Sequence, residues 1–323
     1  RSARNLVCLF RVANPTDLAG LLRFAAQATP NLAHPGHELG ADARRVWVSR
    51  AAVSSWFPKR GRTVQPLILA KGRELRGLVV LRGLRGMATW EVDQLLVGTE
   101  SRHTSAELLA RADVSLVRTG AERIILRLAE DDDAVGSAYE AGYRRYKEES
   151  IFCTSSTRTL GGALPLPLDV AAHSKIPEDE YSLFRLYTAA NPVFIRTAEG
   201  LTFREWNDTT SVRSQGMRNV KDTVFDSGGQ PVAWLRTGVG SSGQSLVQAV
   251  FHPDRRTELI EPVLSLALVA AKGKPLAAVV SSNDDLVARM VEDAGLRYQG
   301  RFLNLIHHIR DRATENSFMP APV

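Results

Sequence analysis

One order of secondary-structure patterns occurs twice in this chain, from Thr89 to Tyr143 and again from Ser245 to Leu296. Each copy starts with a strand-like run, TWEVDQLLV or SLVQAVF, followed by a long helical run, a second strand and a shorter helix. A strand, helix, strand order predicts parallel pairing with helices packed on the sheet. The repeat therefore predicts an α/β protein with two domains, each a mixed β-sheet (α+β) flanked by helices.

The length of 323 residues also fits two domains. We expect the N-terminal domain in residues 1–153, a linker in 154–180, the C-terminal domain in 181–312 and a loose tail in 313–323. The linker segment holds Gly-Gly, several prolines and little periodicity, which argues against a packed element there.

The strand predicted at Thr89–Val97 carries two carboxylates. Simple alternation places Trp90, Val92, Gln94 and Leu96 on one face, and Glu91, Asp93, Leu95 and Val97 on the other. Elsewhere, Asn14 before Pro15 predicts a helix start, and Asp226–Gly229 predicts the turn of a hairpin.

The composition is that of an ordinary globular protein, with 44% hydrophobic and 24% charged residues. No apolar run reaches the roughly 20 residues that a membrane-spanning helix needs, so we expect no membrane contact. The two cysteines, Cys8 and Cys153, have no metal-ligand spacing. Two cysteines that need no disulfide fit a reducing compartment, and we expect a cytoplasmic location.

The net charge of +6 lies entirely in the first half of the chain. Arg44 to Arg85 contains eleven basic residues and one acid, Glu74. Such a region attracts cofactor phosphates, nucleic acid or an acidic protein, or is a solvated basic face. Trp47, Trp56 and Phe57 are the aromatic residues within it, so nucleic-acid binding has the least support.

Each copy closes its last helix with similar residues, EAGY at 140–143 and EDAGL at 292–296. These endings and the repeated element order resemble the GCN5-related N-acetyltransferase (GNAT) superfamily, in a tandem form with degenerate motifs. The resemblance implies acetyl-CoA or another acyl-CoA as cofactor, and a small-molecule or peptide amine as acceptor.

Members of that family hold the acyl-CoA pyrophosphate in a loop of the pattern Arg/Gln-x-x-Gly-x-Gly/Ala, where backbone N–H groups approach the phosphates. The resemblance places this loop at Ser101, Arg102, His103, Thr104 and Ser105 in the first copy. In the second copy, Arg255–Glu261 has no glycine, and Glu258 and Glu261 oppose a pyrophosphate.

The resemblance also suggests catalytic residues. The family's tyrosine acid is replaced by Ala138 and Val291, and Tyr139 lies one residue away from the first position. Asp93 or Glu91 would be the base, acting through a water. Backbone N–H groups of Leu95, Leu96 and Val97 would contact the acyl group and hold the oxyanion.

Two functions follow as alternatives. The first is an acyl-CoA-dependent N-acyltransferase whose N-terminal domain holds acyl-CoA and whose C-terminal domain is mainly structural. The second is a catalytically inactive scaffold, a pseudoenzyme that binds a protein partner, since fold does not determine function.

The run GVGSSG at 238–243 matches the residue pattern of a dinucleotide-binding fingerprint, but a strand follows it, so we interpret it as a hairpin loop.

Overall fold

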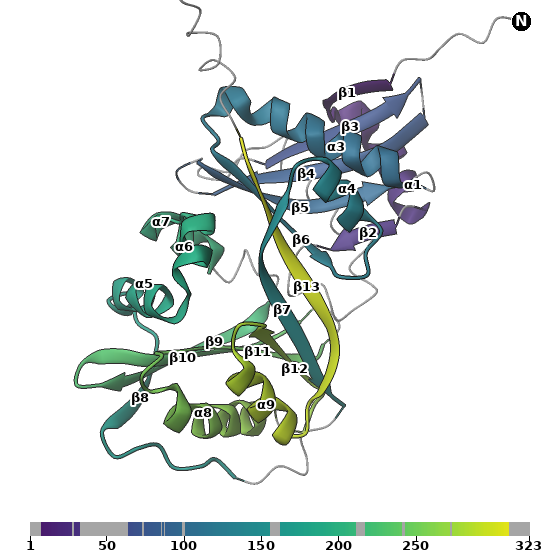
Figure 1. The fold of residues 1–323 in the computed structure, drawn as a ribbon. Helices are drawn as coiled ribbons and strands as arrows, with labels where there is room; N and C mark the ends of the chain where they lie inside the picture. Colours follow the sequence, from purple (N-terminus) through teal and green to yellow (C-terminus); the bar gives the residue numbers. More distant parts are fainter. Residues whose placement is uncertain are drawn as a thin grey trace, which may run out of the picture.

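The computed structural model describes residues 8–27, 29–32, 64–72, 74–84, 86, 88–98, 101–155, 162–210, 217–240, 243–271 and 273–309. Partial alternation in VWVSRAAV at 46–53 predicts an edge strand, and this run and the basic residues between 44 and 63 lie outside these ranges. The described residues form a mixed α and β fold, as predicted, in which long strands connect two halves (Figure 1).

The first half contains the elements of the first predicted copy and those preceding it. Asn14 caps the start of the first helical segment, where its backbone N–H donates to Asp17 Oδ2 at 2.7 Å. The elements in chain order are β1 (Cys8–Val12), η1 (Pro15–Asp17), α1 (Leu18–Gln27), β2 (Thr29–Leu32), β3 (Val64–Lys71), β4 (Glu74–Gly83), β5 (Thr89–Val97), α3 (Ser101–Leu116), η4 (Val117–Thr119), β6 (Arg123–Ala129), α4 (Ala134–Glu140) and β7 (Arg144–Thr154).

The second half repeats the order strand, helix, strand, helix, strand, as the sequence predicts. The hairpin predicted at Asp226–Gly229 is confirmed, because Gly228 and Gly229 both have positive φ between two paired strands. The elements are β8 (Val170–Ser174), α5 (Asp179–Ala190), α6 (Val193–Glu199), α7 (Phe203–Thr209), β9 (Arg218–Ser227), β10 (Gln230–Val239), β11 (Ser245–Phe251), α8 (Arg256–Ala271), β12 (Leu276–Ser281), α9 (Asp285–Asp293) and β13 (Arg297–His308). Strand β8 falls inside the segment predicted to be a linker.

All strands of the described residues join one sheet in the order β1-β3-β4-β5-β6-β13-β7-β12-β11-β10-β9-β8, and β2 pairs with β5 outside this path. The last strand of each half crosses to the other. Strand β13 pairs with β6 of the first half, and β7 pairs with β12 of the second half. The two halves therefore share backbone hydrogen bonds along β7 and β13 (Figure 1).

Each half contains one pair of parallel strands that begins together and then separates. Strands β5 and β6 pair at Thr89–Glu91, and β11 and β12 pair at Ser245–Val247. Beyond these residues the freed edge of β5 pairs with β2, from Thr29 opposite Val97 to Leu32 opposite Gln94. Among the described residues, no strand adds to the freed edge of β11.

The predicted alternation along β5 holds up to Asp93 and is wrong beyond it. The register passes from Leu81 opposite Val92 to Val80 opposite Gln94, so Asp93 is an extra residue in a β-bulge. The bulge reverses the faces: Leu95 and Val97 share a core with Trp90 and Val92. Leu96 packs in a different cluster, with α1.

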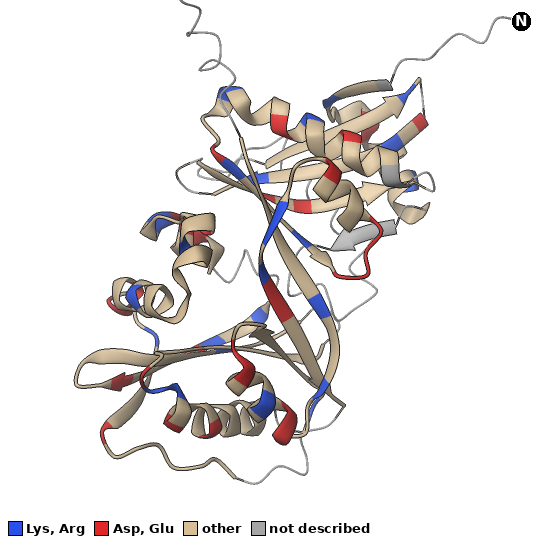
Figure 2. Ribbon diagram, viewed as in Figure 1, with Lys and Arg blue, Asp and Glu red and all other residues tan. Residues whose placement is uncertain are grey.

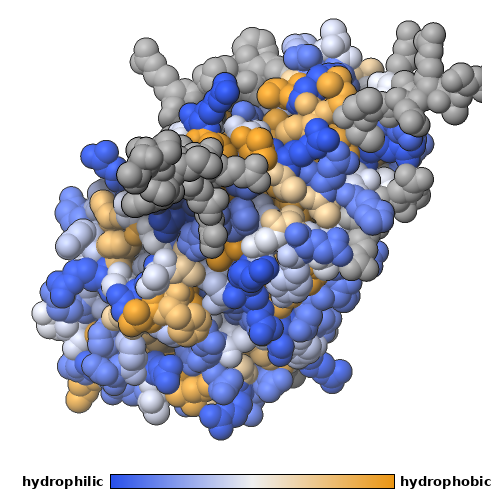
Figure 3. All heavy atoms as spheres, turned by 45° about the horizontal axis from the view of Figure 1, so that its top comes forward, coloured by the Kyte–Doolittle hydropathy of each residue, from blue (hydrophilic) through white to orange (hydrophobic). Residues whose placement is uncertain are grey.

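Helices α3 and α4 cover one face of the first half, and α8 and α9 cover one face of the second (Figure 1). Gly77 lets α3 approach β4, because a Cβ there would lie 2.4 Å from Leu108 Cδ1. On the face shown in Figure 3, hydrophobic side chains form small patches among hydrophilic ones. Within the described part of the chain, no helix combines the length and the apolar character needed to cross a membrane.

Candidate functional site

A cavity of about 440 Å³ lies between the two halves. Strands β4, β5, β6 and β7 present charged side chains to it and β13 presents Asn304, while the freed edges of β11 and β12 supply mainly apolar side chains. Figure 2 shows blue and red segments along the long central strands. The side chains that line the cavity include Arg82, Glu91, Asp93, Arg127, Tyr146, Lys147, Glu149, Tyr187, Glu199, Trp206, Trp234, Arg236, Val247, Gln248, Ala249, Arg256, Ala278, Ser281, Val291 and Asn304.

Arg82 joins the two carboxylates that the sequence suggested as bases. Its side chain is 5% exposed, bonds Glu91 through one terminal nitrogen, and donates Nε–H to Asp93 Oδ1 at 2.9 Å. Burial alone would lower the pKa of Arg82, but Glu91 and Asp93 raise it above its ordinary value. Alternation along β5 places Asp93 on the face of Glu91, so one guanidinium reaches both carboxylates.

Glu149 on β7 forms a second charged group in the cavity wall. Its Oε2 accepts from Arg127 Nε at 2.8 Å, and its Oε1 lies 3.0 Å from Lys147 Nζ. Burial would raise the pKa of Glu149, but Lys147 and Arg127 hold it well below its usual range. Burial would lower the pKa of Lys147, yet Glu149 and Glu199 raise it, so this lysine stays an ammonium group.

Glu199, the last residue of α6, connects the second half to β7. Its carboxylate accepts hydrogen bonds from Tyr187 Oη of α5 and from Tyr146 Oη of β7, the latter at 3.3 Å. Its carbonyl oxygen accepts from Arg123 Nη1 at 2.9 Å. Burial and the Glu199 charge raise the pKa of both tyrosines, so both hydroxyls keep their protons.

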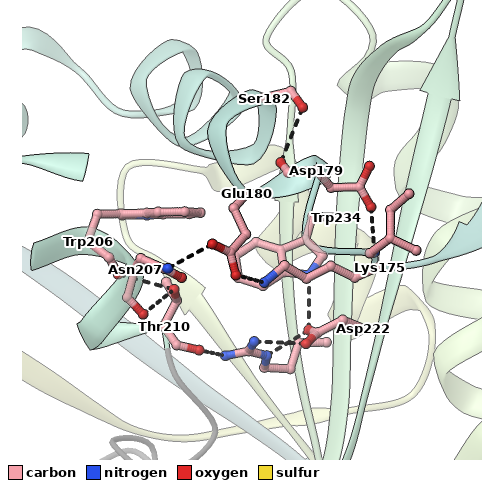
Figure 4. Close-up of polar contacts among 11 residues, drawn as sticks. Lys175, Asp179, Glu180, Ser182, Trp206, Asn207, Thr210, Asp222 and Trp234 are labelled. Carbon is pink, nitrogen blue, oxygen red and sulfur yellow. Dashed lines mark hydrogen bonds and ion pairs between the residues drawn. The ribbon is translucent and has the colours of Figure 1, made fainter. Parts of the chain in front are cut away.

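Helices α5, α6 and α7 cover the cavity and are attached to β9 and β10. Asp222 accepts from Trp234 Nε1 at 3.0 Å and from Arg236 Nε at 2.7 Å (Figure 4). Asn207 of α7 donates to Glu180 of α5 at 2.9 Å. Trp206 packs against Trp234 with ring centroids 6.1 Å apart, so the aromatic residues bind this cover to the sheet.

The residues predicted to contact the acyl group, Leu95, Leu96 and Val97, are on the part of β5 that pairs with β2. All three side chains are buried. The backbone edge that would receive a ligand is therefore already paired within the chain.

The predicted phosphate loop forms the first turn of α3. The side chains of Ser101 and Arg102 lie outside the described part, His103 is exposed, Thr104 is half-buried and Ser105 is buried. Tyr139 is 39% exposed on α4 and is absent from the cavity lining. The structure thus brings Glu91 and Asp93 to the cavity, but not Tyr139.

The loop of the second half begins α8, next to the open pair of strands. Arg255 binds Asp169 and Glu258, away from the cavity lining. Arg256, the first residue of α8, lines the cavity and lies 3.6 Å from Asp284. A cation at a helix start beside an apolar groove suits an anionic group of a ligand.

Several cavity residues were missed by the sequence analysis, among them Arg82, Arg127, Lys147, Glu149, Glu199 and Asn304. The signal for Arg127 was present, because an arginine in the apolar strand RIILRLA needs an unusual environment. Glu199 had no such signal, since glutamate is ordinarily a surface residue and its burial shows only in the structure. Within the described residues, no three His, Cys, Asp or Glu side chains gather as a metal site.

In each half, two parallel strands pair over three residues and then separate, and helices follow in the same order. This arrangement defines the tandem GNAT fold. No family model and no curated protein matches the sequence. A tandem GNAT protein from the clavulanic acid biosynthesis pathway matches with a TM-score of 0.61 and 15% identity, over 94% of this chain and 99% of that one. A GCN5-related N-acetyltransferase from Sphaerobacter thermophilus gives 0.59 and 14%, over 94% and 96%.

A putative acetyltransferase from Pyrococcus horikoshii matches with a TM-score of 0.51 and 11% identity, covering 96% of this chain and 93% of that one. The matches extend over nearly the whole chain, so they concern both halves and their arrangement. At these identities they establish the tandem GNAT fold and leave the activity to be argued from the site.

Proposed function

We propose that this protein is an acyl-CoA-dependent N-acyltransferase that transfers an acyl group to an amine in the cavity between its halves. The observation that carries the proposal is the freed edge of β11, which opens onto that cavity. An open strand edge offers backbone N–H and C=O groups to an extended ligand. The amide-containing arm of CoA has this extended, hydrogen-bonding character.

The geometry favours the second half as the acyl-CoA site. There the groove has an apolar floor of Val247, Ala278 and Val291 and ends near Arg256. In the first half, β2 covers the corresponding edge. The sequence-based assignment to the first half, through Ser101–Ser105 and Leu95–Val97, remains the competing prediction.

In the reaction, the amine nitrogen attacks the thioester carbonyl carbon, a C–N bond forms, and the C–S bond breaks. The nitrogen loses one proton to a base, and the CoA thiolate takes one proton from solvent. Glu149 is a poor base, because two cations hold its pKa low. We propose Glu199 as the base for an acyl group held in the second half, because two tyrosine hydroxyls donate to its carboxylate.

If acyl-CoA binds in the first half instead, Asp93 or Glu91 would accept the proton through a water, with Tyr139 or solvent protonating the thiolate. One variant for each binding mode distinguishes the two. Glu199→Gln should lower turnover and spare CoA affinity in the first mode, and Asp93→Ala should do so in the second. An unchanged rate removes the altered residue from the mechanism.

The alternative function is a non-catalytic scaffold that binds a protein partner. It is favoured by Ala138 and Val291 at the positions of the family's tyrosine, and by carboxylates that are already paired with cations. This alternative predicts no turnover with any amine.

The deciding experiment is a calorimetric titration with acetyl-CoA and with free CoA at two salt concentrations. We expect micromolar binding that Arg256→Ala weakens and that Arg102→Ala and the exposed control Arg289→Ala leave unchanged. If Arg102→Ala abolishes CoA binding and Arg256→Ala does not, the acyl-CoA site lies in the first half. No binding up to millimolar concentrations would contradict the enzyme proposal and favour the scaffold.

A further inference from the structure

Three polar side chains form a straight row across the strands that the halves exchange. Asn304 of β13 lies opposite Arg127 of β6 on one side and opposite Lys147 of β7 on the other. Residues that are directly opposite in a sheet share a face. All three line the cavity, while Leu303 and Leu305, which flank Asn304, point into the hydrophobic core.

Two side chains of this row, Lys147 and Asn304, carry N–H donors beyond those that the contacts below use. Glu149 binds the row with both carboxylate oxygens, Oε2 for Arg127 and Oε1 for Lys147. The Lys147 ammonium carries three N–H donors. Asn304 is 7% exposed, and its Nδ2 is buried with no hydrogen-bond partner in the described residues.

Protein packing alone does not account for Asn304. A buried amide donor without a partner costs about 1 to 3 kcal/mol, and a leucine would fill the same volume without that cost. Lys147 adds further N–H donors to the same wall of the cavity.

We propose that the row formed by Arg127, Asn304 and Lys147 binds a carboxylate of the amine acceptor, so that the acceptor is a small amino carboxylate. A carboxylate supplies acceptors for the Asn304 amide N–H groups and for the remaining N–H donors of Lys147. A dianionic phosphate fits less well, because Glu149 and Glu199 lie close by.

The position of the row indicates the length of this acceptor. Strand β12 lies between β7 and the open edge of β11, so two strand spacings, about 10 Å, separate the row from the groove. The lysine and asparagine side chains cover part of that distance. The amine and the carboxylate should therefore be separated by a spacer of several atoms. This inference rests on the proposed acyl transfer for the role of the amine.

Binding of straight-chain amino carboxylates, from glycine to aminocaproate, is measured by calorimetry without acyl-CoA, each beside its own carboxamide. We expect one of the longer acids to bind at least about tenfold more tightly than its amide, as for a charge-assisted hydrogen bond. Asn304→Leu and Lys147→Gln should each remove that preference. Asn304→Leu should leave the unfolding midpoint unchanged or higher, because the donor has no protein partner.

Lys175→Gln is the matched control, because Lys175 has the same 20% exposure and an ion pair with Glu180 outside the cavity lining (Figure 4). It should keep the preference for the acid. Equal affinity for acid and amide, no binding across the whole series, or a preference that survives both cavity variants would overturn the proposal. Acid preference in a protein that does not bind CoA would uphold this carboxylate site and reject the acyltransferase function.

Discussion

In the first half, β5 and β6 pair over three residues and β2 then covers the freed edge of β5; in the second half, β11 and β12 pair over three residues and the freed edges line a cavity. The buried arginines on the strands next to these pairs also differ. Arg82 turns toward β5 and binds Glu91 and Asp93, whereas Arg236 turns toward β9 and binds Asp222.

This difference teaches that one supersecondary order can be closed in one copy and open in the other. The strand pair alone does not decide whether a half can take a ligand. That depends on what the chain adds to the freed edge and on where the neighbouring charges find partners. Four predictions break or sharpen the comparison, beginning with the largest effect.

Arg82→Met should destabilise the protein by about 3 to 5 kcal/mol, because it removes the buried counterion of two half-buried carboxylates. Arg236→Met should reduce the stability less, since it removes the ion-pair partner of one carboxylate, Asp222, which still accepts a hydrogen bond from the Trp234 indole. Thermal unfolding of both variants measures the difference. Adding Glu91→Gln and Asp93→Asn to Arg82→Met should restore most of the loss, and equal losses for the two arginines would contradict the asymmetry.

Ala249→Trp should weaken CoA binding by more than about 100-fold, or about 2.7 kcal/mol, because the indole would occupy the open groove. Val114→Trp, on an exposed position of α3, is the control and should bind as the unaltered protein does. Titration with CoA checks both. Unweakened binding to the Ala249→Trp protein would move the ligand away from β11.

The repeat and the element order were predictable from sequence, because hydrophobic periodicity and punctuation by Gly and Pro report local structure. The tandem GNAT fold followed from the resemblance of this order and of the two helix endings to that family. The pairing of β2 with β5 was not, since a four-residue strand containing Pro30 has no distinct pattern. The bulge at Asp93 was also missed, because it depends on the register with Leu81 and Val80, and register is a tertiary property.

The candidate site was predictable only in part. Glu91 and Asp93 stood out as carboxylates in an apolar strand, and the structure places both at the cavity. Arg82, Asn304 and Glu199 meet there because β7 and β13 exchange between the halves. No local pattern records such an exchange, so the partners of each charge become visible only in the folded chain.

Gly77→Ala should destabilise the first half by about 2 kcal/mol, as overpacking does, because the new methyl would meet Leu108 and the carbonyl oxygen of Leu96. Gly300→Ala is the matched control, since a Cβ there meets nothing within 4 Å. The unfolding midpoint should fall for the first variant and stay for the second. A similar midpoint for both would mean that α3 can move away from β4 without cost.

The smallest effect concerns pH, and it also separates the halves. His307 of β13 lies 3.2 Å from Asp113 of α3, and this contact raises the pKa of His307. The contact stabilises the charged imidazole, so its contribution is complete at pH below the ordinary histidine value of about 6.5 and disappears as the pH rises through the raised pKa.

In the second half, α8 corresponds to α3, and it packs on the sheet through apolar side chains, among them Leu259, Val263 and Ala267. Asp113→Asn should therefore reduce stability by about 1 kcal/mol or less at acid pH, the range of a partly exposed ion pair, and should have almost no effect in alkaline solution. Unfolding of the variant and the unaltered protein across this pH range measures the difference. A gap between them that stays constant, or widens as the pH rises, would assign the stabilisation to packing at the end of α4 and not to the charge on His307.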